Sequence, residues 1–155
     1  MSEIFTIVCE NVSVSLVQDI LTAYAAGTKK LQLLGVELGA NGQTTVGNLP
    51  IRIRYLPATV THGSGGSAVT PTNVNPDGAS ASFTAARNNT TQSTSSGTVD
   101  IVASQFNPIN GYYWQPPTQI GDEPKADLSG AFVLSLDGVP LGTLGVSATM
   151  WLREI

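Results

Sequence analysis

Hydrophobic residues recur at every second position over most of this chain. The clearest case is the run Ile51-Arg-Ile-Arg-Tyr, in which apolar and charged side chains alternate. Because successive side chains of a β-strand point to opposite faces, this run predicts a half-buried strand. The same period continues through residues 4–16, where both sides are largely apolar. That pattern predicts a strand that is covered on both faces.

Other segments with this period are short and lie between Gly, Pro and Asn residues. The stretch 16–26 also carries a partial helical stripe, and a single helical turn there is compatible with its residues. We expect a strand instead, because its neighbours are strands and Gly27 ends the segment early. The pattern predicts an all-β, single-domain β-sandwich over residues 1–155, jelly-roll-like, with long polar loops. The remaining expected strands are residues 31–38, 83–87, 98–106, 112–115, 131–136 and 144–152.

Three connections are unusually long for a compact domain, at residues 62–80, 88–97 and 116–129. Loops of this length are commonly functional or mobile. Their polar and mostly uncharged composition suits arms that lie on another protein, and it equally suits plain flexible loops.

Charge and cysteine content exclude several classes of protein. Seven Lys and Arg stand against eleven Asp and Glu, so the net charge of −4 argues against binding to nucleic-acid phosphates. No apolar run approaches the roughly 20 residues of a membrane-spanning helix. Cys9 is the only cysteine, which excludes a disulfide scaffold. The first residues lack the pattern of a signal peptide, so we expect synthesis in a reducing cytoplasm.

The residues that carry chemistry do not form an enzyme motif. His62, the only histidine, precedes a Gly-Ser-Gly-Gly run at 63–66. A nucleophilic serine also needs an orienting acid and an oxyanion hole, and the run lacks the Gly-x-Ser-x-Gly spacing. A phosphate loop would be followed by a lysine and a helix, whereas Thr70-Pro71 follows here. We therefore expect a protein that is not an enzyme and that binds no cofactor.

Metal ligands are equally sparse. One histidine and one cysteine cannot complete a zinc tetrad. Asp122, Glu123 and Asp127 form a small acidic cluster that does not match a calcium loop. A solvated loop is the expected role of this cluster, and calcium between subunits is the alternative. Cys9 lies in an apolar strand and is expected to be a buried, unreactive thiol.

Aromatic residues cluster at Tyr112-Tyr113-Trp114. Core packing would use alternate members of this run, and a protein interface would use Tyr and Trp as anchors. A platform for sugar rings is the third possibility. Trp114 and Trp151 are expected to be anchors of the core or of a subunit interface.

The order of the segments resembles a group of small β-sandwich proteins of tailed phages and prophages, the capsid cement or decoration proteins. The resemblance covers most of residues 28–155, whereas the first 27 residues carry little of it. Its most specific pieces are the Gly-Ser-Gly-Gly-Ser…Thr-Pro loop and the Asn-Asn-Thr-Thr segment. The segments that carry it are Leu31-Gln-Leu-Leu-Gly-Val-Glu-Leu, Ile51-Arg-Ile-Arg-Tyr, Thr61-His-Gly-Ser-Gly-Gly-Ser-Ala-Val-Thr-Pro, Phe83-Thr-Ala-Ala-Arg-Asn-Asn-Thr-Thr, Phe106-Asn-Pro, Tyr112-Tyr-Trp-Gln-Pro-Pro-Thr and Val146-Ser-Ala-Thr-Met-Trp-Leu-Arg-Glu.

The resemblance implies a structural virion protein that binds the outer surface of the phage head and bridges major capsid subunits. It implies the major capsid protein and further copies of this chain, as a homodimer or homotrimer, as partners, and neither nucleic acid nor membrane. The alternatives are a tail or neck component and a module that binds carbohydrate or a cell surface. The expected contact regions are residues 2–10, 62–78 and 107–127, and the N-terminal strands within 1–27 can contribute. The candidate contact residues are Ile4, Phe5, Ile7, His62, Ser64, Val69, Tyr112, Tyr113, Trp114 and Ile120.

Overall fold

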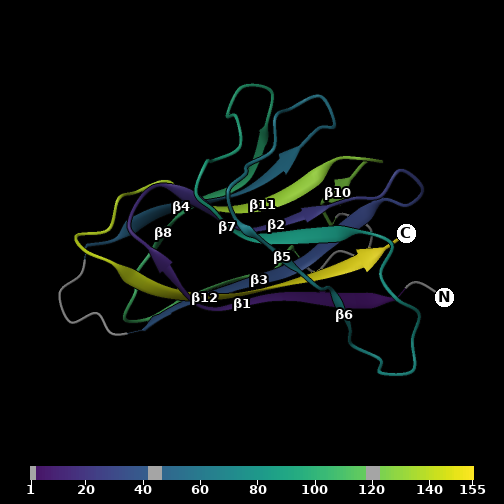
Figure 1. Cartoon of the computed structure of the whole chain (residues 1–155), viewed down its shortest axis with the longest axis horizontal. Coiled ribbons are helices and arrows are strands. Elements are labelled where there is room, and N and C mark those ends of the chain that lie inside the picture. The colour runs from purple at the N-terminus through teal and green to yellow at the C-terminus, as the bar shows by residue number, and fades with distance from the viewer. Residues whose placement is uncertain (1–2, 42–46, 118–122) are drawn as a thin grey trace.

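A computed structural model describes residues 3–41, 47–117 and 123–155, which form two antiparallel sheets and no helix (Figure 1). None of these residues therefore belongs to a helix that could cross a membrane. The first sheet has the order β10 (Lys125–Ala126), β3 (Leu31–Asn41), β12 (Leu144–Glu154), β1 (Ile4–Val14) and β6 (Thr72–Asn73), and β9 (Tyr112–Trp114) also pairs with β3. The second sheet has the order β5 (Ser67–Val69), β7 (Thr84–Asn89), β2 (Gln18–Tyr24), β11 (Ala131–Leu136), β4 (Leu49–Leu56) and β8 (Val99–Phe106).

Eight of these strands pair in a nested order. β1 pairs with β12, β2 with β11, β3 with β9, and β4 with β8, so the early strands meet the late ones. This nesting places β9-β3-β12-β1 in one sheet and β2-β11-β4-β8 in the other, which is the arrangement of a jelly roll. The β5 and β7 strands extend the second sheet beyond β2. The fold is thus an all-β sandwich, as the alternation of the sequence predicted.

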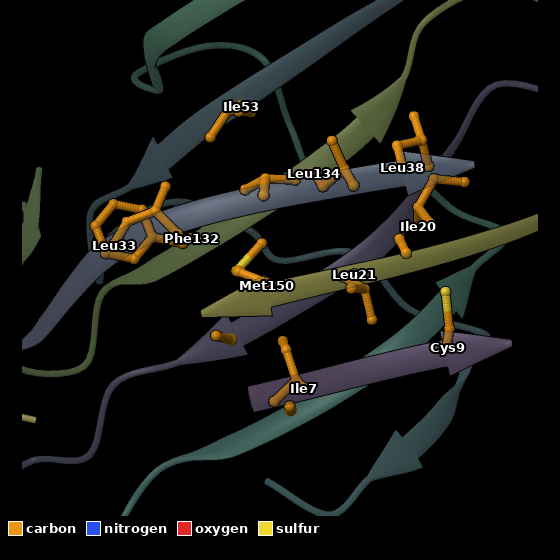
Figure 2. Packing of buried hydrophobic residues seen from close by; sticks show 14 of the residues in the cluster. Ile7, Cys9, Ile20, Leu21, Leu33, Leu38, Ile53, Phe132, Leu134 and Met150 are labelled. Carbon is orange, nitrogen blue, oxygen red and sulfur yellow. The ribbon is translucent and has the colours of Figure 1, made fainter. Parts of the chain in front are cut away.

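The core lies between the two sheets (Figure 2). Ile7 and Cys9 of β1, Met150 of β12 and Phe132 and Leu134 of β11 are among the buried residues that meet there. In β12, buried and partly exposed residues alternate along all eleven positions, because one face of this strand packs against the second sheet.

The two central strands β2 and β11 of the second sheet are covered on both faces. Strands β2 and β11 are buried along nearly every residue, including Thr22 on the side away from the core. The segments 57–66 and 90–98 supply this second cover. Val60 packs there against a small cluster of Leu56, Ala131 and Val133.

Most of the expected strands are confirmed, including a strand rather than a helix within residues 16–26. The structure also places short strands inside segments that the sequence assigned to loops. β5 and β6 lie within 62–80, and β10 lies within 116–129. These two- and three-residue strands are defined by the strands that they pair with. Each is too short for its sequence to show an alternation of apolar and polar residues.

Candidate interaction site

Four connections join strands of opposite sheets at one end of the sandwich, and three of them lie fully within the described residues (left of Figure 1). These three are, in order across the sandwich, residues 15–17, 137–143 and 107–111, and only residues 47–48 of the fourth are described. The strand register fixes this order, because Val14 pairs with Leu144 while Gln18 pairs with Leu136. Asn48, which precedes β4, and Asn107, which follows β8, are also neighbours, because the Asn107 Nδ2 donates a hydrogen bond to the Asn48 Oδ1 at 3.3 Å.

Large apolar side chains are exposed on these connections. Leu141 is 89% exposed, the largest exposed fraction of these side chains. We call this set the apolar end, and its members are Leu16, Val17, Ile109, Val139 and Leu141. Contiguous exposed apolar groups on a soluble protein mark sites of contact with a partner. The apolar end is therefore the strongest candidate for an interaction site.

Charge is nearly absent from the apolar end. In the described parts of the four connections, Asp137 is the only ionisable residue. Its carboxylate is held by Arg52 and Arg54, with nitrogen–oxygen distances of 2.7 Å to each. Asp100 of β8 pairs with the same two arginines. This network neutralises Asp137 and leaves an uncharged surface beside it.

Ion pairs gather at the opposite end, where both termini lie (Figure 1). The Lys29 Nζ donates to the Glu154 Oε2 at 2.6 Å, and the Lys30 Nζ donates to the Asp127 Oδ1 at 2.7 Å. Burial raises the pKa of Glu154, but hydrogen bonds from Lys29 and Ser82 outweigh it and hold the pKa below its usual value. Ion pairs thus lie near both ends of the sandwich, and the exposed apolar side chains set the apolar end apart.

A buried polar cluster lies beneath segments 57–66 and 90–98. The Asp19 Oδ2 accepts hydrogen bonds from the backbone N and hydroxyl of Ser93, and the Ser93 Oγ accepts one from the Gly63 N at 3.1 Å. The His62 ring lies 5.1 Å from the Tyr24 ring, and burial lowers the pKa of His62. Within the described part of the chain, the Asp19 Oδ1 and the His62 Nε2 have no hydrogen-bond partner.

The role of this cluster is structural, because it holds segments 57–66 and 90–98 against the second sheet. The single hydroxyl proton of Ser93 goes to Asp19 and not to the imidazole of His62, so the geometry of a nucleophile–base pair is missing. In the described part of the chain, no three His, Cys, Asp or Glu side chains converge as metal ligands. Of the acidic cluster noted in the sequence, Asp127 pairs with Lys30, Glu123 accepts from Gln32, and Asp122 lies outside the described residues.

The candidate contacts of the N-terminal strand require a correction. Phe5 and Ile7 are fully buried in the sandwich core, so their side chains stabilise the fold and present no contact surface. Ile4 is partly exposed. β1 is also not a free strand, because β12 pairs along its length and β6 pairs with Phe5 and Thr6 on the other edge. Among the described residues, no strand pairs with this second edge of β1 along residues 7–14.

The remaining candidates are divided between the two sheets. His62 and Ser64 lie over the second sheet, where Ser64 bridges to Thr91, and Val69 lies in the edge strand β5. Ile120 lies outside the described residues. The structure thus brings no large group of the sequence-predicted contacts together.

The aromatic run divides between the two faces of the first sheet. Tyr112 and Trp114 pack against the core, as expected for alternate members of a strand. Tyr113 points outward and is 61% exposed. Its ring lies 6.5 Å from that of Trp151, which is only partly buried on the same outer face. Trp151 is therefore not a core anchor.

Sequence reasoning missed the apolar end. A usable signal was present, because residues 137–143 read Asp-Gly-Val-Pro-Leu-Gly-Thr between two expected strands. Val139 and Leu141 are apolar residues in a connection, where a loop without a partner would carry polar ones.

No protein-family model, curated protein or solved structure significantly matches this chain.

Proposed function

We propose that this chain is a structural protein of a tailed-phage particle, which binds the outer surface of the head and bridges neighbouring major capsid subunits. The observation that carries the proposal is the apolar end. Five large apolar side chains are exposed on connections at this one end, and a partner that removes them from water would stabilise the complex. The resemblance of residues 28–155 to capsid decoration proteins supplies the identity of that partner.

The scaffold behind the apolar end suits a permanent contact. Each of its connections joins two strands that are anchored in opposite sheets, so the side chains are presented on short, supported loops. Little conformational entropy is then lost on binding, which favours stable attachment. The absence of ionisable side chains other than Asp137 favours a neutral or apolar surface of the shell over a charged one.

Self-association belongs to the same proposal, and β8 supports it. This strand lies at the edge of the second sheet, so its outer backbone groups have no strand partner among the described residues. Asp100, its only charged residue, is paired with Arg52 and Arg54. An unblocked edge with little free charge can pair with a second copy.

Co-sedimentation with undecorated phage shells tests the contact with the head. We expect the wild-type chain to pellet with shells and Leu141→Asp to remain in the supernatant, because burying a charge in an apolar contact is costly. Leu128→Asp is the matched control: Leu128 is 44% exposed on the connection between β10 and β11, outside the crossover connections and the expected contact regions, and the control should pellet like wild type. Failure of the wild-type chain to pellet, or equal pelleting of both variants, would reject the proposal.

Light scattering tests self-association. We expect a mass of two or three times 16.1 kDa for the wild-type chain. Ala103→Lys adds a charge to β8 and should shift the protein towards the monomer, because edge lysines block strand pairing.

The pelleting experiment also tests the alternative, because pelleting with tails instead of shells would indicate a tail or neck component.

A further inference from the structure

The outer face of the first sheet carries a second surface, separate from the apolar end. Strand pairing places Val8, Thr149, Glu37 and Tyr113 in one row across β1, β12, β3 and β9. The neighbouring rows contain Thr6, Trp151 and Gly35 on one side, and Ser147 and Gly39 on the other. The face therefore combines Val8 and small hydroxyl or glycine positions with two aromatic rings and the central carboxylate of Glu37, and Glu10 of β1 lies at its border.

The two rings form a fixed corner. Tyr113 and Trp151 meet at 71° with their centroids 6.5 Å apart, which is a favourable edge-to-face arrangement. The indole of Trp151 lies beside Gly35, where an added Cβ would come within 3.6 Å of its Cε3. The Tyr113 hydroxyl donates to the Gln115 Oε1 at 2.8 Å. These contacts hold the rings in place before any ligand arrives.

Shallow grooves lie on both sides of the central carboxylate. One, of about 230 Å³, runs between β1 and β3 across Ser147 and Thr149. The other, of about 250 Å³, is bounded by Tyr113 and the 110–111 turn. Glu37 and Gly39 border both grooves, and a Cβ added at Gly39 would meet nothing within 4 Å. The floor is thus open enough for a ring-shaped ligand to reach Glu37.

The negative charge of the Glu37 carboxylate limits which ligands can bind to this face. Among the described residues, no cation or hydrogen-bond donor pairs with it. Two copies packed face to face across a two-fold axis would bring two Glu37 carboxylates together without a counter-charge, which disfavours a second copy. The same charge disfavours phosphates and acidic sugars. A ligand with several neutral hydroxyl donors and an apolar ring face fits instead.

We propose that the Tyr113–Trp151–Glu37 face binds a neutral saccharide. The C–H face of a pyranose ring stacks on the aromatic corner, and two of its hydroxyls donate to the Glu37 carboxylate. The hydroxyls of Ser147 and Thr149 complete the polar contacts along the groove. Sites of this kind combine an apolar wall with a few placed polar groups. This inference does not depend on the proposed attachment to a phage head, because it uses a different surface.

An array of neutral hexose and N-acetylhexosamine oligosaccharides tests the proposal, with titration calorimetry on the best binder. We expect the wild-type chain to bind at least one of them. Glu37→Gln should weaken binding about tenfold, as expected for a lost hydrogen bond to a charged group. Tyr113→Ala should weaken it about fivefold through loss of stacking. Both positions are exposed, and thermal unfolding checks that the variants fold.

Asp77→Asn is the matched control, because it also neutralises one exposed carboxylate but lies on the connection that follows β6, outside this face. It should bind like the wild-type chain. Absence of binding to every neutral oligosaccharide, binding of acidic sugars alone, or binding that survives both Glu37→Gln and Tyr113→Ala would overturn the proposal. Pelleting with shells should be unchanged in these variants, so failure here is distinct from failure of the capsid proposal.

Discussion

The carboxylate of Asp19 accepts two hydrogen bonds from Ser93, one from the hydroxyl and one from the backbone N at 2.9 Å. Asp19 lies on β2, whereas Ser93 lies 74 residues further along the chain in the segment that covers the second sheet. The Gly63 N donates to the same hydroxyl, so one pair of residues fastens both covering segments to the sheet. This fastening explains how the outer side of β2 is buried without a third sheet.

Replacing Ser93 by Ala should therefore destabilise the protein. The substitution removes the hydroxyl donor to Asp19 and the acceptor of the Gly63 N, and it leaves both groups in a buried place. A buried polar group without its partner costs about 1–3 kcal/mol in the free energy of unfolding. Urea denaturation measures this loss. Ser96→Ala, an exposed position on the same segment, is the control and should change the free energy by less than about 0.5 kcal/mol; equal losses would contradict the fastening.

Burial also makes the stability of this cluster depend on pH. Desolvation raises the pKa of Asp19 above 3.8, although hydrogen bonds from Ser93 oppose it. As pH rises above 3.8, the unfolded chain loses its proton before the folded one, so the contribution of Asp19 to stability falls until the raised pKa is passed. We expect the free energy of unfolding of wild type, relative to Asp19→Asn, to decrease between pH 3 and pH 7. A flat or rising difference would contradict the burial of an ionisable carboxyl.

Two glycines offer a matched test of close packing between strands. A Cβ at Gly66 would lie 2.2 Å from the Arg87 backbone O and 2.5 Å from the Asn89 Oδ1, where the chain enters β5 beside β7. Backbone must move to admit it, so Gly66→Ala should lower the free energy of unfolding by about 1–3 kcal/mol. At Gly39 a Cβ meets nothing within 4 Å, and Gly39→Ala should be neutral or slightly stabilising. Thermal unfolding of the two variants measures the contrast, and equal midpoints would show that β5 is displaced in solution.

Local patterns predicted the strands but not the partners that bury their polar residues. The alternation in residues 51–55 predicted a half-buried strand, and Ile51 and Ile53 are indeed in the core. Arg54, however, is only 5% exposed, because Asp100 and Asp137 close over it from β8 and from the end of β11. Those carboxylates lie 46 and 83 residues away in sequence, and a period of two holds no information about them.

The candidate site shows the same limit. The sequence predicted that alternate members of the run 112–114 would pack in the core, and Tyr112 and Trp114 do. It could not predict that Tyr113 would meet Trp151, because β9 and β12 become neighbours only through β3. The apolar end likewise forms only when the nested order of the jelly roll brings connections from three parts of the chain to one end.

The buried thiol of Cys9 gives a direct test of the sandwich core. Burial raises the pKa of Cys9 from 9.0 to about 11, against smaller opposing effects from backbone hydrogen bonds and Arg87, and the side chain is 1% exposed. At pH 8 only roughly one thiol in a thousand would then be ionised, against about one in ten for a thiol of pKa 9, and the thiolate is the reactive form. Ellman's reagent should therefore not react with the native protein at pH 8, and it should react with one thiol per chain in urea. The labelling rate should rise with urea along the unfolding transition, because access requires β1 to separate from β12. Rapid labelling without denaturant would show that this strand pair opens in the native state.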